Sequence, residues 1–292
     1  KGEEGAFWNE VATLGTIRHR NITRLVGWGA SRGGGARLLF YSYHPNGSLS
    51  SFLHGGGKAA GEWETRFEVA VGVAHAVAYL HHDCVPAIVH GDVKAMNVLL
   101  GTGYEPYLAD FGLARPVTAA GDGKDSGASP RVVAGSYGYM APEHASAQRI
   151  TEKSDVYSYG VVLVEVLTGR HPLDPSLPGG RPLVQWVLDH WHSRGDPSDL
   201  LDPRLCGLPE SQLHEMAQAM AVAVLCLARR PSDRPTMKDV VALLEEIRRP
   251  VADAPKEPPA VAVAAPPPSP PVRSFTLRGS SNCSFALSDS SS

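Results

Sequence analysis

The stretch HGDVKAMNVLL occupies residues 90–100, and it is followed by DFG at residues 110–112 and by APE at residues 141–143. Asp110 comes 18 residues after Asp92. Each of these short motifs is weak evidence by itself, because three letters recur by chance in many proteins. Their order and spacing together are far more specific, so this combination decides the predicted fold class.

In this order the three motifs resemble the signature set of the protein kinases: a catalytic loop, a metal-binding DFG and the end of an activation segment. The resemblance implies an α+β, protein kinase-like fold with a small β-rich N-lobe and a mainly helical C-lobe. It also implies an enzyme that uses ATP and Mg²⁺ as cofactors and transfers the γ-phosphate to proteins. Such a reaction needs few catalytic residues, because the protein mainly positions the reactants and neutralises charge.

The resemblance gives four residues of these motifs catalytic roles. Asp92 would accept the proton of the attacking hydroxyl group, and Asn97 and Asp110 would offer oxygen ligands to Mg²⁺, a hard cation that prefers them. Lys94 would place its ammonium group beside the transferred phosphoryl group, so it also counts as a cofactor-binding residue. Lys94 and the hydroxyl of Ser136 in GSYGYMAPE resemble serine/threonine kinases rather than tyrosine kinases. The expected acceptor is therefore Ser or Thr.

Further nucleotide contacts are expected from the first helix and from a hinge. Glu10 lies at the edge of the apolar stripe of the first helix, where it could reach water or, by the resemblance, pair with a strand lysine that holds the α- and β-phosphates. Backbone groups of the hinge would bind the adenine edge. Tyr41 would be the gatekeeper, although plain core packing would explain it equally well. The expected residues of this region are Tyr41, Ser42, Tyr43 and His44.

Two features depart from the kinase pattern. Gly91 stands where most kinases have an arginine that grips a phosphorylated activation loop, so activity is expected to depend less on phosphorylation of Thr118, Ser126 or Ser129. No G-x-G-x-x-G loop and no V-A-I-K-type lysine precedes Glu10. Lys1 precedes a Gly/Glu turn rather than lying within an apolar strand, so these elements are expected upstream of the printed start.

Apolar spacing and turn residues predict the secondary structure. The expected helices are residues 3–14 with Gly15 as the cap, 63–82, 155–169, and a last helix that opens with a capping box from Thr236 to Asp239. The expected strands are 22–28, 37–43, 97–100 and 106–110. The family pattern adds an ion pair between Glu143 and Arg234 and hydrogen bonds from the catalytic-loop backbone to Asp155.

The domain boundaries follow from these elements. Residues 1–47 are expected to form a truncated N-lobe that ends in the hinge, and residues 48–249 the C-lobe. From Pro250 the composition changes, because Pro and Ser supply 17 of the last 42 residues, so residues 250–292 are predicted to be a disordered tail. The Gly-, Ala- and Ser-rich run 119–130 is predicted to be a mobile loop.

Composition excludes several classes of protein. The net charge is 27 − 30 = −3, which argues against nucleic acid as a partner. No apolar run is long enough to span a bilayer, so this piece is expected to be soluble. The cysteines have neither disulfide nor metal spacing and are expected to be inert; they are Cys84, Cys206, Cys226 and Cys283. Because the chain begins with Lys1 rather than Met, it is expected to be part of a longer polypeptide.

Among kinases the sequence most resembles the plant leucine-rich-repeat receptor-like kinases. The segments that carry this resemblance are LHHDCVPAIVHGDVKAMNVLLG (80–101), RHRNITRLVGWG (18–29) and GSYGYMAPEH (135–144). The tail SSNCSFALSD (280–289) resembles the subgroup that perceives root growth-factor peptides. The resemblance implies a single-pass membrane receptor with an extracellular repeat domain, and the kinase domain on the cytosolic face of the plasma membrane.

The implied partners are protein substrates, a co-receptor kinase and a peptide ligand bound by the missing ectodomain. The alternative function is a pseudokinase-like scaffold or truncated fragment that lacks the glycine loop and the phosphate-binding lysine. Mg-ATP-dependent thermal stabilisation would separate the two functions. A third possibility is a gene-model artefact with no cellular protein.

Overall fold

The computed structural model describes residues 2–31, 36–56, 60, 62–117, 135–145, 150–193, 195–205 and 207–248. The predicted loop 119–130 and the predicted tail 250–292 lie outside these residues, and so do the three candidate phosphorylation sites. In the described residues, no helix is both long enough and apolar enough to cross a membrane.

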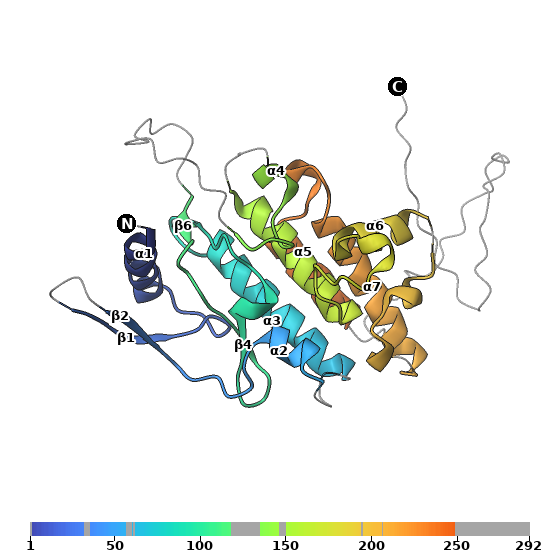
Figure 1. The fold of residues 1–292 in the computed structure, drawn as a ribbon, viewed down its shortest axis with the longest axis horizontal. Helices are drawn as coiled ribbons and strands as arrows, with labels where there is room; N and C mark the ends of the chain where they lie inside the picture. The colour runs from blue at the N-terminus through green and yellow to red at the C-terminus, as the bar shows by residue number, and fades with distance from the viewer. Residues whose placement is uncertain are drawn as a thin grey trace, which may run out of the picture. The chain divides into compact units, whose positions relative to one another are not determined.

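The chain begins with a helix and a β-hairpin: α1 (Gly2–Thr16), β1 (Leu25–Ala30) and β2 (Arg37–Tyr41). The strands are antiparallel and pair Trp28 with Leu39. Rings of α1 lie on this hairpin, because Phe7 and Trp8 make edge-to-face contacts with Trp28 at 6.3 and 5.2 Å. Figure 1 shows α1 and the hairpin at the opposite end of the described part from α6 and α7.

Several predicted boundaries in this region are wrong; the strand predicted for 37–43, for example, ends at Tyr41. Two of these differences have identifiable reasons. Gly15 does not cap α1, because it is not in the left-handed region and the helix continues to Thr16, whose hydroxyl donates to Thr13 O at 2.9 Å. The first strand begins at Leu25 rather than at residue 22. Thr23 instead donates its N–H to Leu108 O at 2.9 Å, so this segment pairs with a different strand.

One face of the hairpin is apolar and open to solvent. Alternation along β1 and β2 places four side chains on this face, and each is between 49% and 67% exposed; they are Val26, Trp28, Leu38 and Phe40. Trp28 is the member of this set that the rings of α1 cover in part.

The remainder of the fold is mainly helical. The helices are α2 (Leu49–His54), α3 (Trp63–His82), α4 (Pro142–Ala145), α5 (Glu152–Thr168), α6 (Leu183–His192), α7 (Glu210–Cys226) and α8 (Met237–Ile247), with 3₁₀ turns η3 (Pro178–Gly180), η4 (Pro197–Leu200), η5 (Pro203–Leu205) and η6 (Pro231–Asp233) between them. Helix α3 packs against α5 and α8, and α5 packs against α7. Every residue of α5 from Ser154 to Thr168 is buried, so this helix is the centre of the core.

The predicted helices are confirmed, and α1 and α5 extend beyond their predicted bounds. Helix α3 has the predicted bounds, and α8 begins after the predicted capping box of Thr236 and Asp239. Helix α5 starts three residues before the predicted Asp155, because Thr151 and Ser154 form a capping box of their own. It ends as predicted at Gly169, which takes φ +63°.

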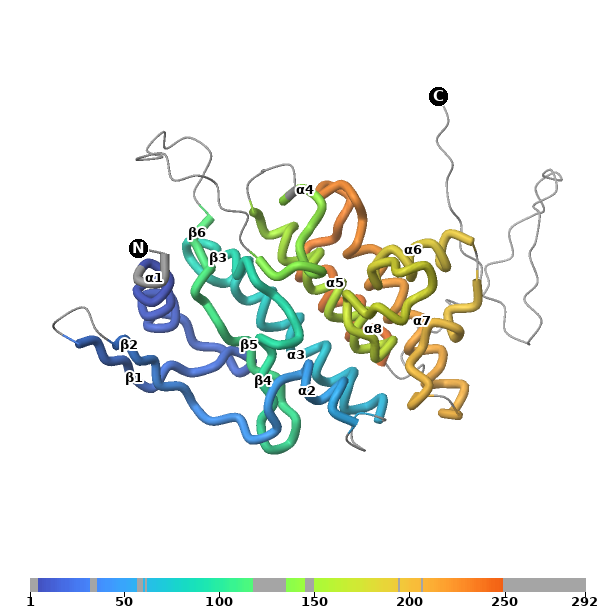
Figure 2. The backbone as a smooth tube through the Cα atoms, viewed as in Figure 1, coloured from blue at the N-terminus to red at the C-terminus, as the bar shows by residue number. Residues whose placement is uncertain are grey.

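Short strands carry the motifs between the hairpin and the helices. Strand β3 (Ile88–Val89) pairs with β6 (Arg115–Pro116), and β4 (Val98–Leu100) pairs with β5 (Pro106–Leu108). The turn η2 (Ala95–Asn97) precedes β4, so Asn97, the first residue of the predicted strand 97–100, lies outside the observed strand. Strand β5 stops before Asp110 because Asp110 has φ +64°, which an extended strand cannot accommodate. Figure 2 shows these strands between α1 and α5.

Candidate active site

The backbone of the predicted catalytic loop is fixed from the buried helix α5. Asp155 accepts hydrogen bonds from His90 N–H at 2.7 Å and Gly91 N–H at 2.9 Å, as the sequence predicts. His81 of α3 contributes a third contact, with Nε2 2.9 Å from Asp155 Oδ2. Burial alone would raise the pKa of Asp155, but these partners hold the pKa below its ordinary value. The carboxylate is therefore ionised and holds the loop in place.

Gly91 has a local reason to be glycine. Its φ is +83°, and a Cβ at this position would lie 3.2 Å from Leu113 O. Glycine adopts this backbone conformation without strain, whereas residues with a Cβ atom are strained in it. An arginine here would therefore need both a strained backbone and a small shift of residue 113.

His90 connects the catalytic loop to the DFG segment. Its Nδ1 accepts the Asp92 N–H at 3.2 Å, so the proton of the neutral ring must sit on Nε2, which lies 3.2 Å from Ala109 O. The ring packs edge-to-face on Phe111 with centroids 4.8 Å apart. Complete burial lowers the pKa of His90, so the neutral form persists.

Three predicted residues converge on the carboxylate of Asp92. Lys94 Nζ lies 2.6 Å from Asp92 Oδ2 and 2.7 Å from Ser136 Oγ. Asn97 Nδ2 donates to the Asp92 carbonyl at 2.9 Å and to Oδ2 at 3.2 Å, and Ser136 N–H donates to Asp92 Oδ1 at 3.0 Å. Asp92 is only 9% exposed. The structure therefore brings Asp92, Lys94, Asn97 and Ser136 together, as the resemblance to kinases implies.

The DFG segment is attached to α1. Asp110 is exposed and in the left-handed region, with Gly112 N–H 3.4 Å from its Oδ1. Asn9 Nδ2 contacts the carbonyl oxygens of Phe111 at 3.1 Å and Ala114 at 2.5 Å. Asn9 was not predicted as a site residue, since a single polar residue on a helix carries no signal of a partner about a hundred residues away.

Glu10 is buried as predicted, but the structure gives it different partners. Tyr41 donates its hydroxyl to Glu10 Oε1 at 2.5 Å, and Phe111 N–H donates to the same oxygen at 3.2 Å. Burial raises the pKa of Glu10, and the two hydrogen bonds oppose that rise. The expected lysine partner is not found among the described residues. Neither sequence reading of Tyr41 anticipated this bond.

The predicted hinge is only partly available to a ligand. Ser42 N–H already donates to Arg24 O at 3.1 Å, so the hydrogen bond that it was expected to offer to adenine is in use. The ring of His44 is tilted against the ring of Tyr107, with the ring centroids 4.3 Å apart. Its Nε2 lies 3.2 Å from Thr23 Oγ1. Tyr43 is 87% exposed. The backbone of Tyr43 and His44 is therefore the better candidate for adenine contacts.

A bidentate ion pair braces the helical part of the chain. Arg234 Nη1 and Nη2 each lie 2.7 Å from an oxygen of Glu143, and both side chains are buried. Arg234 also donates to Ala228 O and Lys153 O, and its guanidinium lies 4.9 Å from the ring centre of Tyr157. This confirms the predicted pair. The charge of the arginine keeps the pKa of Glu143 below its ordinary value although burial acts in the opposite direction.

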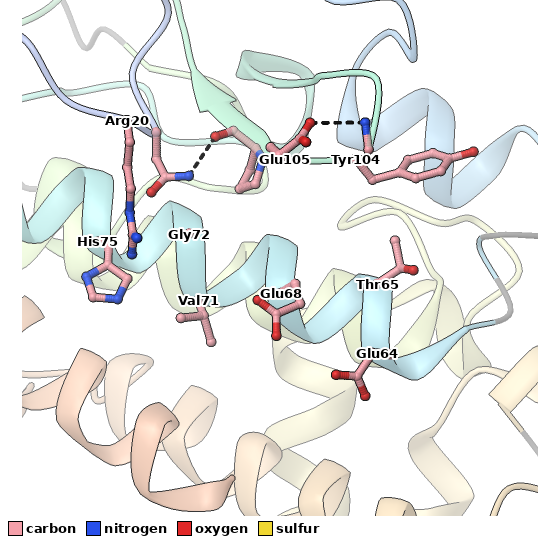
Figure 3. A pocket seen from close by; sticks show the side chains of 12 residues that line it. Arg20, Glu64, Thr65, Glu68, Val71, Gly72, His75, Tyr104 and Glu105 are labelled. Atoms are coloured by element: carbon pink, nitrogen blue, oxygen red, sulfur yellow. Dashed lines mark hydrogen bonds between the residues drawn. The ribbon is translucent and has the colours of Figure 1, made fainter.

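A cleft of about 430 Å³ lies elsewhere, between α3 and the β4–β5 turn. Figure 3 shows Glu64, Glu68 and His75 of α3 on one side and Tyr104 and Glu105 on the other. None of the predicted catalytic or nucleotide-binding residues lines it. Arg248 at the end of α8 pairs with both Glu64 and Glu68, so these carboxylates have a structural partner. The cleft is therefore not the active site.

Sequence comparison agrees with this geometry. The family model for protein tyrosine and serine/threonine kinases matches residues 1–244. The chain belongs to this family. The kinase domain is 60% identical over 301 residues to the leucine-rich repeat receptor-like serine/threonine-protein kinase RGI4 of Arabidopsis thaliana, and 59% identical over 304 residues to RGI3 of the same plant. Both alignments cover 100% of this chain and 27% of the relative. RGI1 is 50% identical over 249 residues, 85% of this chain and 21% of the relative.

These comparisons confirm the predicted kinase fold and the resemblance to plant leucine-rich-repeat receptor-like kinases. The kinase domain spans about a quarter of the length of the curated relatives that it matches. Protein kinase domains use ATP and a divalent metal in general.

The donor set of the kinase domain fits such a metal. Asn97 uses its Nδ2 group on Asp92, which leaves the amide oxygen as the acceptor available to a cation. Asp110 offers an exposed carboxylate with one weak internal contact. Carboxylate and amide oxygens are suitable ligands for Mg²⁺, which usually takes one or two protein ligands together with water and substrate phosphates.

Proposed function

We propose that the chain is the catalytic domain of a plasma-membrane leucine-rich-repeat receptor kinase, and that it transfers the γ-phosphate of ATP to serine or threonine hydroxyls of proteins. The observation that carries this proposal is the arrangement around Asp92, in which Lys94, Asn97 and Ser136 all bond to one buried carboxylate. The similarity to receptor-like serine/threonine kinases supports the choice of acceptor and the membrane-bound parent.

The free acceptor sites of Asp92 indicate where the substrate hydroxyl would bind. Oδ2 faces both Lys94 and Asn97, whereas Oδ1 accepts only the Ser136 N–H among the described hydrogen bonds. A carboxylate oxygen has two lone-pair sites, so Oδ1 keeps one for the acceptor hydroxyl. Asp92 would orient this hydroxyl and take its proton as the bond to phosphorus forms.

Lys94 is placed to compensate charge in the same step. Its ammonium group has three donors, and two of them are used on Asp92 and Ser136. The third would bind an oxygen of the transferred phosphoryl group. Mg²⁺ held by Asn97 and Asp110 would neutralise phosphate charge. Glu10, Tyr43 and His44 are the proposed contacts on the nucleotide side.

The proposed partners follow from the receptor architecture. They are protein substrates, a co-receptor kinase and a peptide ligand bound by an extracellular part of the parent. The proposed location is the cytosolic face of the plasma membrane. The proposed boundaries are those of the sequence analysis: a partial N-lobe at 1–47, the C-lobe at 48–249 and the tail at 250–292.

One observation favours a second candidate function, a catalytically impaired scaffold. Glu10 is engaged by Tyr41 rather than by a lysine in the described residues. A kinase domain in this state would bind Mg-ATP weakly, and its surfaces could still dock on other receptor kinases.

Phosphoryl transfer from γ-labelled ATP to mixed peptides tests the proposal, measured on this chain and on the longer protein that we propose contains it. We expect labelling of Ser and Thr peptides but not Tyr peptides, and a loss of about 10²–10⁴-fold for Asp92→Asn in protein that is still folded at the assay temperature. Labelling that survives Asp92→Asn would contradict the assigned role. Absence of both transfer and Mg-ATP-dependent stabilisation in the longer protein would favour the scaffold.

A further inference from the structure

A carboxyl group that the reaction does not use lies in the last turn of α5. Glu165 has no solvent exposure, and each of its oxygens has a partner from a different part of the chain. Oε1 lies 2.8 Å from His54 Nε2, and Oε2 accepts the Tyr139 hydroxyl at 2.5 Å. Burying a carboxyl group costs free energy unless both of its oxygens have hydrogen-bond partners. Loss of one partner would therefore make the group reorient and would disturb its contact with the other.

The first partner links Glu165 to the surface. His54 is the last residue of α2, and its side chain is 29% exposed. The ring makes an edge contact with His171 at 5.9 Å. No other described side chain is shown bonding Oε1, so His54 is the group that satisfies this oxygen.

The second partner leads to the catalytic centre. Tyr139 donates its N–H to Ser136 O at 3.0 Å, and Ser158 of α5 donates its hydroxyl to Tyr139 O at 2.8 Å. Burial raises the pKa of Tyr139, so its hydroxyl stays protonated and donates to Glu165. Ser136, three residues earlier, contacts both Asp92 and Lys94. The series of contacts therefore runs from His54 through Glu165 and Tyr139 to residues 135–140, which include Ser136 in contact with Asp92.

We infer that His54 is a positioning residue for the protein acceptor, acting through Glu165 and Tyr139 on residues 135–140. Without His54, Glu165 must turn toward another donor, and this movement changes its bond to Tyr139. The 135–140 segment then loses its fixed position against Asp92 and Lys94, where the acceptor hydroxyl binds. This inference rests on the proposed function, and it concerns the acceptor side rather than the nucleotide side of the site.

The test compares His54→Ala with His54→Gln, because the amide of Gln can donate to Glu165 in place of the imidazole. The matched control is His75→Gln, since His75 also contacts a glutamate, Glu245 at 3.1 Å, but that contact lies between α3 and α8. Amide hydrogen exchange of Ser136 and Tyr139 is measured on the whole chain, because this readout does not need catalysis.

We expect exchange at Ser136 and Tyr139 to accelerate by about 10-fold in His54→Ala, while the His90 and Gly91 amides bonded to Asp155 keep their rates. His54→Gln restores the slow exchange, and His75→Gln leaves it unchanged. Unchanged exchange in His54→Ala would overturn the inference. A uniform acceleration throughout α3 and α5 would overturn it as well, since it would show a general structural role.

Kinetics on the longer protein provide the second readout. We expect His54→Ala to raise KM for an acceptor peptide by about 5-fold while KM for ATP changes less than about 2-fold. Equal changes in both constants would contradict the inference. If the unmodified protein transfers no phosphate, the proposed function fails, and the exchange experiment still decides the role of His54.

Discussion

The hydroxyl of Tyr41 donates to the buried carboxyl group of Glu10 and so joins the end of β2 to α1. Phe111 N–H shares the same carboxyl oxygen, which brings the DFG segment to this point. Three separate parts of the chain therefore meet at one buried acid. The energy of this contact can be measured because Tyr41 contributes a single hydroxyl group to it.

Tyr41→Phe removes that hydroxyl and keeps the ring. We expect the free energy of unfolding to fall by about 1–2 kcal/mol, because Glu10 loses a donor and remains buried. Urea unfolding at neutral pH measures this change. Tyr43→Phe is the control, since Tyr43 is exposed, and it should change stability by less than about 0.5 kcal/mol. Equal stability of the two variants would show that water replaces the lost donor.

Asp155→Asn tests the anchoring of the catalytic loop. The amide supplies one acceptor oxygen where Asp155 has two, so the His90 or Gly91 N–H loses its partner in a fully buried site. We expect a loss of about 3 kcal/mol in the free energy of unfolding, measured in urea. Asp189→Asn, which breaks an exposed pair with Arg181, is the control. A loss below about 1 kcal/mol for Asp155→Asn would contradict the anchoring role.

Arg234→Lys tests the bidentate pair with Glu143. Lysine cannot make two parallel bonds to a carboxylate, so we expect a loss of about 2 kcal/mol, against less than about 0.5 kcal/mol for Arg181→Lys in its exposed pair.

The same pair also gives a pH dependence. The pKa of Glu143 is lower in the folded than in the unfolded chain, so the pair contributes stability above the ordinary value of 4.5, and this contribution is lost as the pH falls through the folded-state pKa. The difference between Arg234→Lys and the unmodified chain should therefore shrink below pH 4.5. A difference that stays constant would contradict the ionic origin.

His144→Leu is expected to stabilise the chain. His144 is buried, and neither ring nitrogen has a hydrogen-bond partner in the described structure. Replacing an unsatisfied polar ring by an apolar side chain of similar size should gain about 1 kcal/mol at pH 7.5. Thermal or urea unfolding measures the gain, and a loss of stability would indicate that the ring has a partner.

The histidine also predicts acid sensitivity. Burial lowers the pKa of His144, with Arg115 and Arg234 adding to the effect and Glu143 and Asp155 opposing it. As the pH falls, the unfolded chain therefore takes up this proton before the folded chain does. The free energy of unfolding then decreases as the pH drops below 6.5. His144→Leu should flatten this decline, whereas exposed His192→Leu should not. An unchanged slope in His144→Leu would assign the acid sensitivity to other groups.

The sequence predicts those structural features that depend on local residue patterns, such as helix bounds and helix caps. Apolar spacing predicts α3 to the residue, and the capping pattern of Thr236 and Asp239 marks the start of α8. The resemblance to kinases also assigns Asp92, Lys94 and Asn97 to one site, and in the structure Lys94 and Asn97 both contact Asp92.

Contacts between distant elements could not be predicted where no family motif covers them. His81 reaches Asp155 across 74 residues, and Tyr41 reaches Glu10 across 31, without any periodic signal. Gly15 was mispredicted for a related reason: a glycine ends a helix only if its backbone turns left-handed, and the surrounding structure decides that.

Because Asp155 anchors the catalytic loop, the position of Asp92 does not depend on the residues that would select the nucleotide. The proposed proton acceptor, Asp92, lies in a loop that is anchored to a buried helix, whereas the β1–β2 hairpin ends at the residues proposed to contact adenine. Substitutions in the hairpin can therefore change which nucleotide analogues or inhibitors the domain accepts while Asp92 stays in place. Substitutions in the hairpin that cause inhibitor resistance would then leave the rate of phosphoryl transfer largely unchanged.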